Sequence, residues 1–534
     1  MSWRPAPALV GVFSAAVAMG VAQLVAGFTI PASSPVLAVG QAAIDLTPQP
    51  VKDFAISAFG ADDKNVLLGG ILVVLAVFAA LIGTLAVRRL RAGLAGLGVF
   101  ACVGLAAALS RPDANAEWVV PTLAGAAAGA FAMVRLTRAA AAMTGRPAAP
   151  PADPDAPAPV FTLLPNPDAP PPSDRKPGGQ ERRRFLVASG LAVATTAIGT
   201  VGGRELAERY NVAKARAALR FPAPAVPAPP LPPGADLRIP GLSSFITQND
   251  KFYRVDTALL LPEVDPATWQ LRIHGMVRRE VRLTFGQLLK RPLIEDYVTL
   301  TCVSDPVSGP YVGNAKWLGA SLAALIRSAG PLAGADQLLC TSVDGFTCGT
   351  PLQVVLDGRD ALLAVAMNGT ALPIAHGFPA RMVVPGLYGY VSATKWVTDI
   401  EVTTFAAASA YWAVRGWAQQ APIKTESRID VPGSGASVPA GRTQVAGVAW
   451  AQHKGVAAVE VRADGGPWQQ ARLAAVPDID TWRQWVWEWD ASPGSHTLEA
   501  RATDATGYTQ TAVQDQPVPN GASGYPSVSV TVRG

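Results

Sequence analysis

Residues able to hold a redox metal are scarce in this chain of 534 residues, which has four cysteines and four histidines. The absence of a CxxCH motif excludes covalent c-type haem attachment, and four dispersed cysteines do not suit an iron–sulfur cluster. All four histidines lie in the C-terminal half, so the apolar N-terminal segments have no ligands for a b-type haem. We therefore expect no haem and no iron–sulfur cluster, and electrons that pass to or from a separate partner. The histidines are His274, His376, His453 and His496.

Charge is also sparse, since 16% of the residues are charged and 50% are hydrophobic. Long apolar runs occupy 8–30, 66–87, 94–109 and 118–136, and a fifth candidate occupies 185–203. Most reach the roughly 17 to 25 residues that a helix needs to cross a bilayer. The run at 94–109 does so only if Leu90 is included, at the cost of Arg91. We expect a four-helix membrane region over 1–140 and a fifth membrane helix over 182–204.

Arginines predict the orientation of these helices, because cytoplasmic loops are enriched in Lys and Arg. Basic clusters fall on alternate loops, and acidic residues fall on the loops between them. The predicted N-terminus is cytoplasmic, and everything after residue 204 is extracytoplasmic in a multi-pass protein of the cell membrane. This placement explains the net charge of +5 without a nucleic-acid partner. The clusters are Arg4, then Arg88, Arg89 and Arg91, then Arg135 and Arg138, then Arg182, Arg183 and Arg184.

The run Arg182-Arg183-Arg184-Phe185-Leu186 permits two interpretations. It resembles a twin-arginine export signal before a mildly apolar helix, and it also suits a simple positive-inside anchor of the fifth span.

Two Pro-rich stretches divide the chain. The stretch 141–181 is rich in Pro, Ala and Asp and predicts a cytoplasmic linker. The stretch 205–236 predicts a spacer between the bilayer and a soluble part that begins near Leu237. Over 237–405, β-rich and helix-like runs alternate, which indicates an α+β domain. Over 406–534, alternating apolar and polar residues between turn signals predict an all-β, immunoglobulin-like sandwich, interpreted as a structural module.

Two motifs in the α+β part carry the chemistry. Cys302 stands in TLTCVSDPVSG, at the end of an apolar strand, and HGFPARMVVPGLYGYVSATKW follows about 75 residues later. A soft thiolate suits a molybdenum centre, and a strand end holds a ligand rigidly beside a cavity. With FITQNDKFYRVDTALLLPEVDP and LLAVAMNGTALPIAHGFPARMVVPG, these segments make residues 245–532 resemble the sulfite oxidase family of molybdopterin oxidoreductases.

The resemblance implies a molybdenum–molybdopterin cofactor whose metal is bound by Cys302. It also implies a dimerisation role for the C-terminal domain, and catalytic roles for Arg254 and Asp344 beside Cys302. The residues expected to bind the cofactor are Asn249, Phe252, Tyr253, Cys302, His376, Arg381, Ser392, Ala393, Thr394 and Lys395.

Departures from the family concern the substrate. Animal and plant sulfite oxidases carry CAGNRR and LAYEMNG, where this chain has CVSDPV and LLAVAMNG. Val365 thus replaces a tyrosine at the anion site, and Asp305 stands where positive charge would gather sulfite. Cys340 and Cys348 can form a hairpin disulfide or remain two core thiols, and Cys102 lies in the third span.

The favoured function is a membrane-anchored, externally facing oxidoreductase that transfers an oxygen atom, by sulfite-like oxidation or by reduction of S- or N-oxides. The alternative is a cofactor-less surface binding protein that keeps the fold. A transporter is disfavoured, because the spans hold almost no ionisable residues.

Replacing Arg182 and Arg183 by Lys separates the two interpretations of the fifth span, because Lys preserves the orienting charge but not the export signal. If export uses the twin-arginine route, the variant enzyme should stay inside the cell. A protease added outside intact cells should then reach the C-terminal half of the parent but not of the variant. Equal cleavage of both proteins would leave the triplet as an anchor.

Overall fold

The structure is a computed structural model that describes residues 6–48, 51, 54, 58–59, 63–111, 114–143, 179–207 and 212–534. It divides into two compact units, Met1–Asn211 and Val212–Gly534. Nearly all of the linker expected at 141–181 lies outside the described residues.

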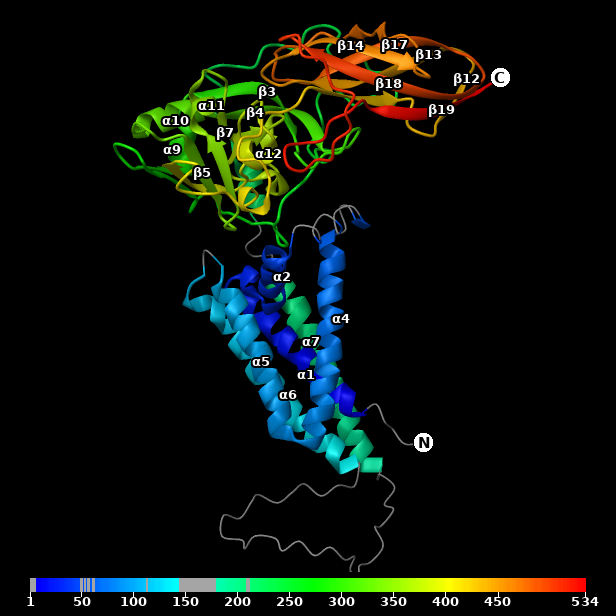
Figure 1. The fold of residues 1–534 in the computed structure, drawn as a ribbon. Coiled ribbons are helices and arrows are strands. Elements are labelled where there is room, and N and C mark those ends of the chain that lie inside the picture. Colours follow the sequence, from blue (N-terminus) through cyan, green and yellow to red (C-terminus); the bar gives the residue numbers. More distant parts are fainter. Residues whose placement is uncertain are drawn as a thin grey trace, which may run out of the picture. The chain divides into compact units, whose positions relative to one another are not determined.

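The first unit is helical (Figure 1). Five of its described helices are long and apolar enough to cross a membrane: Pro7–Phe28, Lys64–Arg88, Leu90–Leu109, Ala116–Ala141 and Arg183–Leu206. The third of these helices, Leu90–Leu109, includes Leu90 and Arg91, and with them it reaches the 20 residues that a membrane span needs. A shorter apolar helix after the first span was not expected. The longer elements are α1 (Ala6–Phe28), α2 (Pro35–Leu46), α4 (Asp63–Arg88), α5 (Leu90–Leu109), α6 (Val120–Met143) and α7 (Gly179–Ala207).

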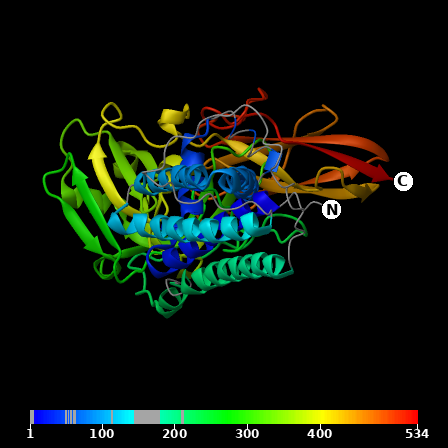
Figure 2. The same ribbon diagram turned by 90° about the horizontal axis from the view of Figure 1, so that it is seen from below.

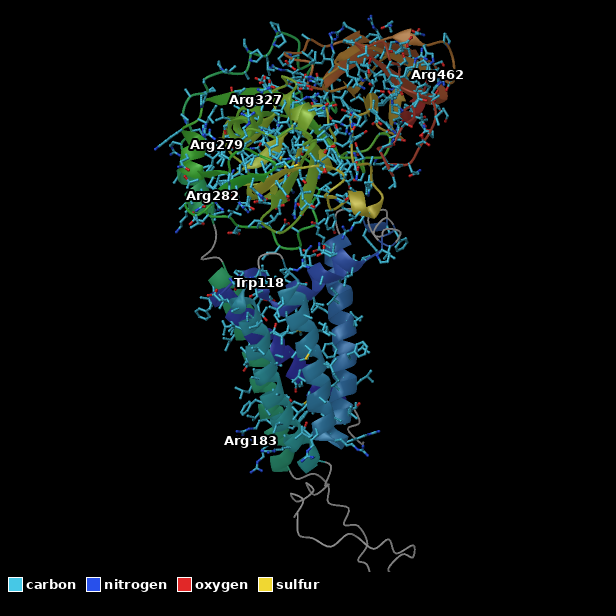
Figure 3. The ribbon with its side chains drawn as sticks, turned by 60° about the vertical axis from the view of Figure 1, so that its left-hand side comes forward. Trp118, Arg183, Arg279, Arg282, Arg327 and Arg462 are labelled. Carbon is cyan, nitrogen blue, oxygen red and sulfur yellow. The ribbon has the colours of Figure 1, made fainter. Side chains whose placement is uncertain are left out.

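Helix α1 packs against α4, α6 and α7, and the helices of the unit lie side by side (Figure 2). Glycines allow this approach: a Cβ on Gly27 would lie 2.6 Å from the carbonyl oxygen of Gly203, and one on Gly125 2.6 Å from that of Ala18. Small residues at such contacts are typical of helices that associate in lipid. Trp118 and Arg183 mark opposite ends of the bundle (Figure 3).

The second unit begins with two sheets that share one core. The first has the order β2-β1-β10-β5-β6, with β1 and β10 parallel, and the second has the order β3-β4-β7-β8, with β9 on β7. Short helices α9 to α12 connect these strands, and α8 precedes β1. The bounds are β1 Gln270–Gly275, β2 Val281–Thr284, β3 Leu293–Thr301, β4 Val312–Ser321, β5 Gln337–Ser342, β6 Thr347–Pro351, β7 Leu362–Met367, β8 Thr370–Ala371, β9 Arg381–Val383 and β10 Val397–Thr403; α8 Ala213–Ala218, α9 Phe285–Leu289, α10 Leu322–Ala329, α11 Leu352–Leu356 and α12 Gly389–Ser392.

Two further sheets, in the orders β11-β13-β17-β16 and β12-β19-β18-β14-β15, form a sandwich over the C-terminal residues. Val445 and Trp485 of one sheet and Val459 and Leu498 of the other share an apolar core. This core is separate from the core of the preceding sheets. Trp482 lies in the C-terminal part of the chain, but its side chain belongs to the core of the preceding sheets. The bounds are β11 Glu426–Val431, β12 Ser437–Pro439, β13 Gly441–Trp450, β14 Val456–Ala463, β15 Gln469–Gln470, β16 Arg472–Leu473, β17 Arg483–Ala491, β18 Gly494–Asp504 and β19 Ser527–Arg533.

Strand β3 is the edge of its sheet, and other parts of the unit cover its outer side. At its start, the N–H of Ala225 donates to Leu293 and the N–H of Glu295 donates to Val226. The Pro-rich run 221–234, expected as a free spacer, is therefore paired with the catalytic part, and Phe221 packs on its core. The compact unit begins at Val212, ahead of the expected start near Leu237. An apolar, Pro-rich arm can cover an edge strand because few of its own N–H groups need partners.

Replacing Ala225 by Pro should destabilise the second unit by about 1–3 kcal/mol, because it removes the N–H that donates to the carbonyl oxygen of Leu293 at 2.8 Å. That oxygen then keeps only the longer bond, 3.3 Å, from the N–H of Val226. Ala223→Pro, in the same run, is the control. A thermal unfolding midpoint that falls only for Ala225→Pro is the expected result, and equal midpoints would contradict the edge pairing.

Candidate functional site

Cys302 directly follows β3 and is buried. Its N–H donates to the carbonyl oxygen of Tyr311 at 2.9 Å, and its Sγ lies 3.0 Å from Oγ of Ser304. Burial raises the pKa of the thiol, and the Ser304 hydrogen bond opposes that shift. A metal that binds this sulfur must therefore displace a proton, as is general for thiolate ligands.

Arg381, the first residue of β9, is a buried cation that has no carboxylate partner among the described residues. Its guanidinium donates to the carbonyl oxygens of His376, Met382 and Ala393 at 3.2–3.4 Å, and it lies 5.0 Å from the ring centre of Trp317. Burial lowers its pKa to about 10. Burying a charge without a counterion costs several kcal/mol, so this position suits a bound anion.

Lys395 and Arg254 share one carboxylate, that of Asp256. Nζ of Lys395 and Nε of Arg254 each lie 2.7 Å from Oδ2 of Asp256. Lys395 also donates to the carbonyl oxygen of Ala375, and burial lowers its pKa to about 8. Two cations with one carboxylate leave a net positive charge, to which Arg381 adds.

His376 stands among these cations as a neutral ring. Burial, followed by the charges of Arg381 and Lys395, lowers its pKa to about 4. Its Nε2 donates to the carbonyl oxygen of Asn249 at 3.1 Å. The ring contacts Phe252, which stacks on Tyr253 with 5.2 Å between ring centres.

Tyr253 connects this group to the cysteine loop. Burial raises the pKa of its phenol, and the charges of Cys302, Arg381 and Asp305 act on it as well. Tyr253, from the segment 249–254, therefore lies within electrostatic reach of residues from both motifs, Cys302 and Arg381.

Asp305 lies in the loop after Cys302 and is buried. Its Oδ1 accepts from the N–H of Tyr311 at 2.8 Å, while its Oδ2 is buried without a hydrogen-bond partner. Burial raises its pKa to about 6, so the carboxylate is mostly ionised at neutral pH. Val365, in β7, is fully buried and contributes no polar group.

Several expected residues have other local roles. The hydroxyl of Ser392 donates to carbonyls of its own turn, at Leu387 and Tyr388. Asp344 lies in the turn between β5 and β6, where it accepts from the N–H of Phe346, and its charge acts on Cys348. Oγ1 of Thr394 is buried and has no hydrogen-bond partner among the described residues.

Cys340 and Cys348 oppose each other across β5 and β6, and both are free and fully buried. Burial raises the pKa of both thiols, and Arg381 lies close enough to Cys348 to affect its titration.

Two residues of this site were missed from the sequence. Asp256 follows Arg254 by two positions, and nothing in that spacing shows that it also reaches Lys395. Gly377 has φ +105°, and a Cβ there would lie 3.0–3.1 Å from Arg381 and Lys395. The sequence signal that could have identified Gly377 was its position between His376 and the run FPAR that ends in Arg381.

These residues fit a cofactor that has an anionic tail and brings its own metal. The buried Arg381 and the unpartnered hydroxyl of Thr394 supply donors, and Cys302 supplies one soft ligand. Among the described residues, no group of three or more His, Cys, Asp and Glu side chains is placed to hold a metal ion by itself.

Comparisons with known proteins agree with this chemistry. Residues 258–412 match the model of the oxidoreductase molybdopterin binding domain. The sulfite oxidase of Gallus gallus is 30% identical over 290 residues, which are 46% of this chain and 62% of that protein. The mitochondrial sulfite oxidase of Homo sapiens is 29% identical over 287 residues, 46% of this chain and 52% of that protein. A solved structure of the sulfane dehydrogenase SoxCD from Paracoccus pantotrophus is 23% identical, covers 54% of this chain and 81% of its own, and has a TM-score of 0.47.

The family match and the site residues agree on a molybdopterin-binding oxidoreductase domain within residues 258–412. The C-terminal half of the chain is thus similar to sulfite oxidases. It spans less than two thirds of the length of these two sulfite oxidases.

Gly377→Ala should lower both cofactor content and stability. A side chain at this positive φ costs about 1–3 kcal/mol, and the new methyl group would also press on Arg381 and Lys395. Gly416→Ala is a matched control, because Gly416 also ends a short 3₁₀ helix at φ +91° but has open space around it. Both variants should lose thermal stability, and only Gly377→Ala should lose molybdenum, as measured by elemental analysis. Equal molybdenum in the two would remove Gly377 from the site.

Proposed function

We propose that this chain is a membrane-anchored oxidoreductase in which Cys302 binds the molybdenum of a molybdopterin cofactor and an oxygen atom is transferred to or from a substrate. The observation that carries the proposal is the buried guanidinium of Arg381, which has no carboxylate partner among the described residues, together with the buried thiol of Cys302. When bound, the cofactor supplies the two-electron oxygen-transfer chemistry.

In this proposal, the protein side chains bind and orient the cofactor. Arg381 and Lys395 hold its anionic tail, and Thr394 donates its free hydroxyl. His376 stays neutral above pH 5 because its pKa is about 4, so its Nε2–H donates without adding charge. Phe252 and Tyr253 cover the location with aromatic rings that limit access of water. The backbone carbonyls of Asn249 and Ala393 accept from His376 and Arg381 and so hold these two side chains in place. Ser392 stabilises its own turn beside Ala393, and Asp344 caps the turn between β5 and β6.

The charges favour reduction of a neutral S- or N-oxide over oxidation of sulfite. Arg254 is held by Asp256, so its charge is partly neutralised. Asp305 is mostly ionised at neutral pH and lies near Cys302, where it repels a dianion. A neutral oxide meets no such barrier. Asp305 and the apolar Val365 therefore support a neutral substrate.

The same proposal includes the cellular location and the partners of the enzyme. The length and apolarity of the five helices support an anchor in the cell membrane, and the arginine pattern supports a second unit outside the cytoplasm. Large apolar side chains exposed on the helices, such as Val73, Val99 and Ile198, would face lipid. The C-terminal sandwich is assigned an immunoglobulin-like fold and a role in a homodimer. A separate electron-transfer protein completes the reaction.

Cys302→Ser should reduce oxide reduction with an artificial electron donor by more than about tenfold, since an alkoxide replaces a soft thiolate poorly. Cys102→Ser, at an exposed position of α5, should keep parental activity. The parent protein, made in a host that produces molybdopterin, should contain about one molybdenum per chain and should reduce S- or N-oxides faster than it oxidises sulfite. A parent without molybdenum would favour a binding protein, and faster sulfite oxidation would reverse the proposed substrate.

A further inference from the structure

The outer edge of β3 just before Cys302 is held by the C-terminal sandwich. The N–H of Thr299 donates to the carbonyl oxygen of Asp480 at 3.0 Å, and its Oγ1 accepts from the N–H of Trp482 at 2.7 Å. The carbonyl oxygen of Thr299 accepts from Nε2 of Gln452 at 3.0 Å. Three polar groups of one residue, three positions from the thiol, are thus bonded to another domain.

Gln452 makes a second contact still closer to the thiol. Its Nε2 also donates to Oγ1 of Thr301 at 3.1 Å, and Thr301 is the neighbour of Cys302. The residue is 2% exposed, and its Oε1 is buried without a partner. Leaving a buried acceptor unsatisfied has a cost, so the position of this amide depends on its two donor bonds to β3.

The far side of the cysteine loop is held as well. Nη1 of Arg428, in β11, donates to the carbonyl oxygen of Gly309 at 2.9 Å. The same guanidinium is fixed by Asp430 and by Ser243. Both ends of the segment that carries Cys302 therefore contact the sandwich.

Two tryptophan side chains pack between the sandwich and the preceding domain, beside these hydrogen bonds. The side chains of Trp450 and Trp482 leave the core of the sandwich and enter the core of the preceding domain. Nε1 of Trp482 donates to the carbonyl oxygen of Phe245 at 2.9 Å. A shift of the sandwich must therefore move the end of β3.

We propose that the sandwich positions the metal-binding thiol, with Gln452 as the positioning residue. The sandwich then affects catalysis indirectly, through the position of Cys302, in addition to any structural or dimerisation role. The inference rests on the proposed role of Cys302 as the molybdenum ligand, and it adds a residue 150 positions away that fixes the direction of the Cys302 side chain.

The test compares Gln452→Met with Gln510→Met in the full chain. Gln510 is also a buried amide of the sandwich, but its bonds go to Ser427, Ala502 and Gly524, all within the sandwich. Met has a similar volume and no donor. Gln510→Met breaks three satisfied bonds and should lower the thermal midpoint more than Gln452→Met, which also removes an unsatisfied acceptor.

Two measurements report on the environment of the Cys302 thiol. In cofactor-free protein, alkylation of Cys302 by iodoacetamide, quantified by peptide mass spectrometry, should be about tenfold faster in Gln452→Met than in the parent. In the loaded protein, the electron paramagnetic resonance spectrum of the molybdenum should change in Gln452→Met. Gln510→Met should match the parent in both readouts despite its lower stability.

A third variant keeps the test decisive if Gln452→Met folds poorly. Thr301→Val removes one of the two bonds to Gln452 and keeps the side-chain shape, so it should raise the alkylation rate by less. In the Gln452→Met background it should add nothing. Parental alkylation and an unchanged spectrum in Gln452→Met would overturn the proposal, as would equal changes in Gln510→Met. If the parent carries no molybdenum, the proposed function fails, and the alkylation rates still decide the role of Gln452.

Discussion

A strand at the edge of a sheet has outward N–H and C=O groups that need partners, and β3 is an edge strand that leads to Cys302. The chain meets this need with two segments that are distant in sequence. The Pro-rich arm pairs with the start of β3, and Gln452, Asp480 and Trp482 of the sandwich pair with its end. The position of the thiol thus depends on contacts that lie outside its own domain.

The second constraint is buried positive charge. Lys395 and Arg254 share the carboxylate of Asp256, and the buried Arg381 has no carboxylate partner among the described residues. Such an excess is unfavourable in an empty interior and favourable around an anion. The shift of the His376 pKa to about 4 follows from the same charges, since they and burial disfavour a further cation. The site therefore favours an anionic ligand over a cationic one.

The apolar helices and the residues of the two motifs could be predicted from the sequence, because apolar length and local spacing are visible along the chain. The position of Cys302 at a strand end followed from the apolar run before it. Asp256 and Gln452 could not be predicted, because their roles come from contacts across 139 and about 150 positions. The Pro-rich arm was interpreted as a spacer because composition shows a lack of N–H donors, but it does not show an edge strand in need of cover.

Cys340 and Cys348 face each other from adjacent strands, and neither has any exposed surface. A dissolved oxidant or a thiol-exchange protein cannot reach such a pair once the sheet has closed. These two free thiols are consequently protected by the closed sheet, and only a local opening of the β5–β6 hairpin would expose them to oxidation or alkylation.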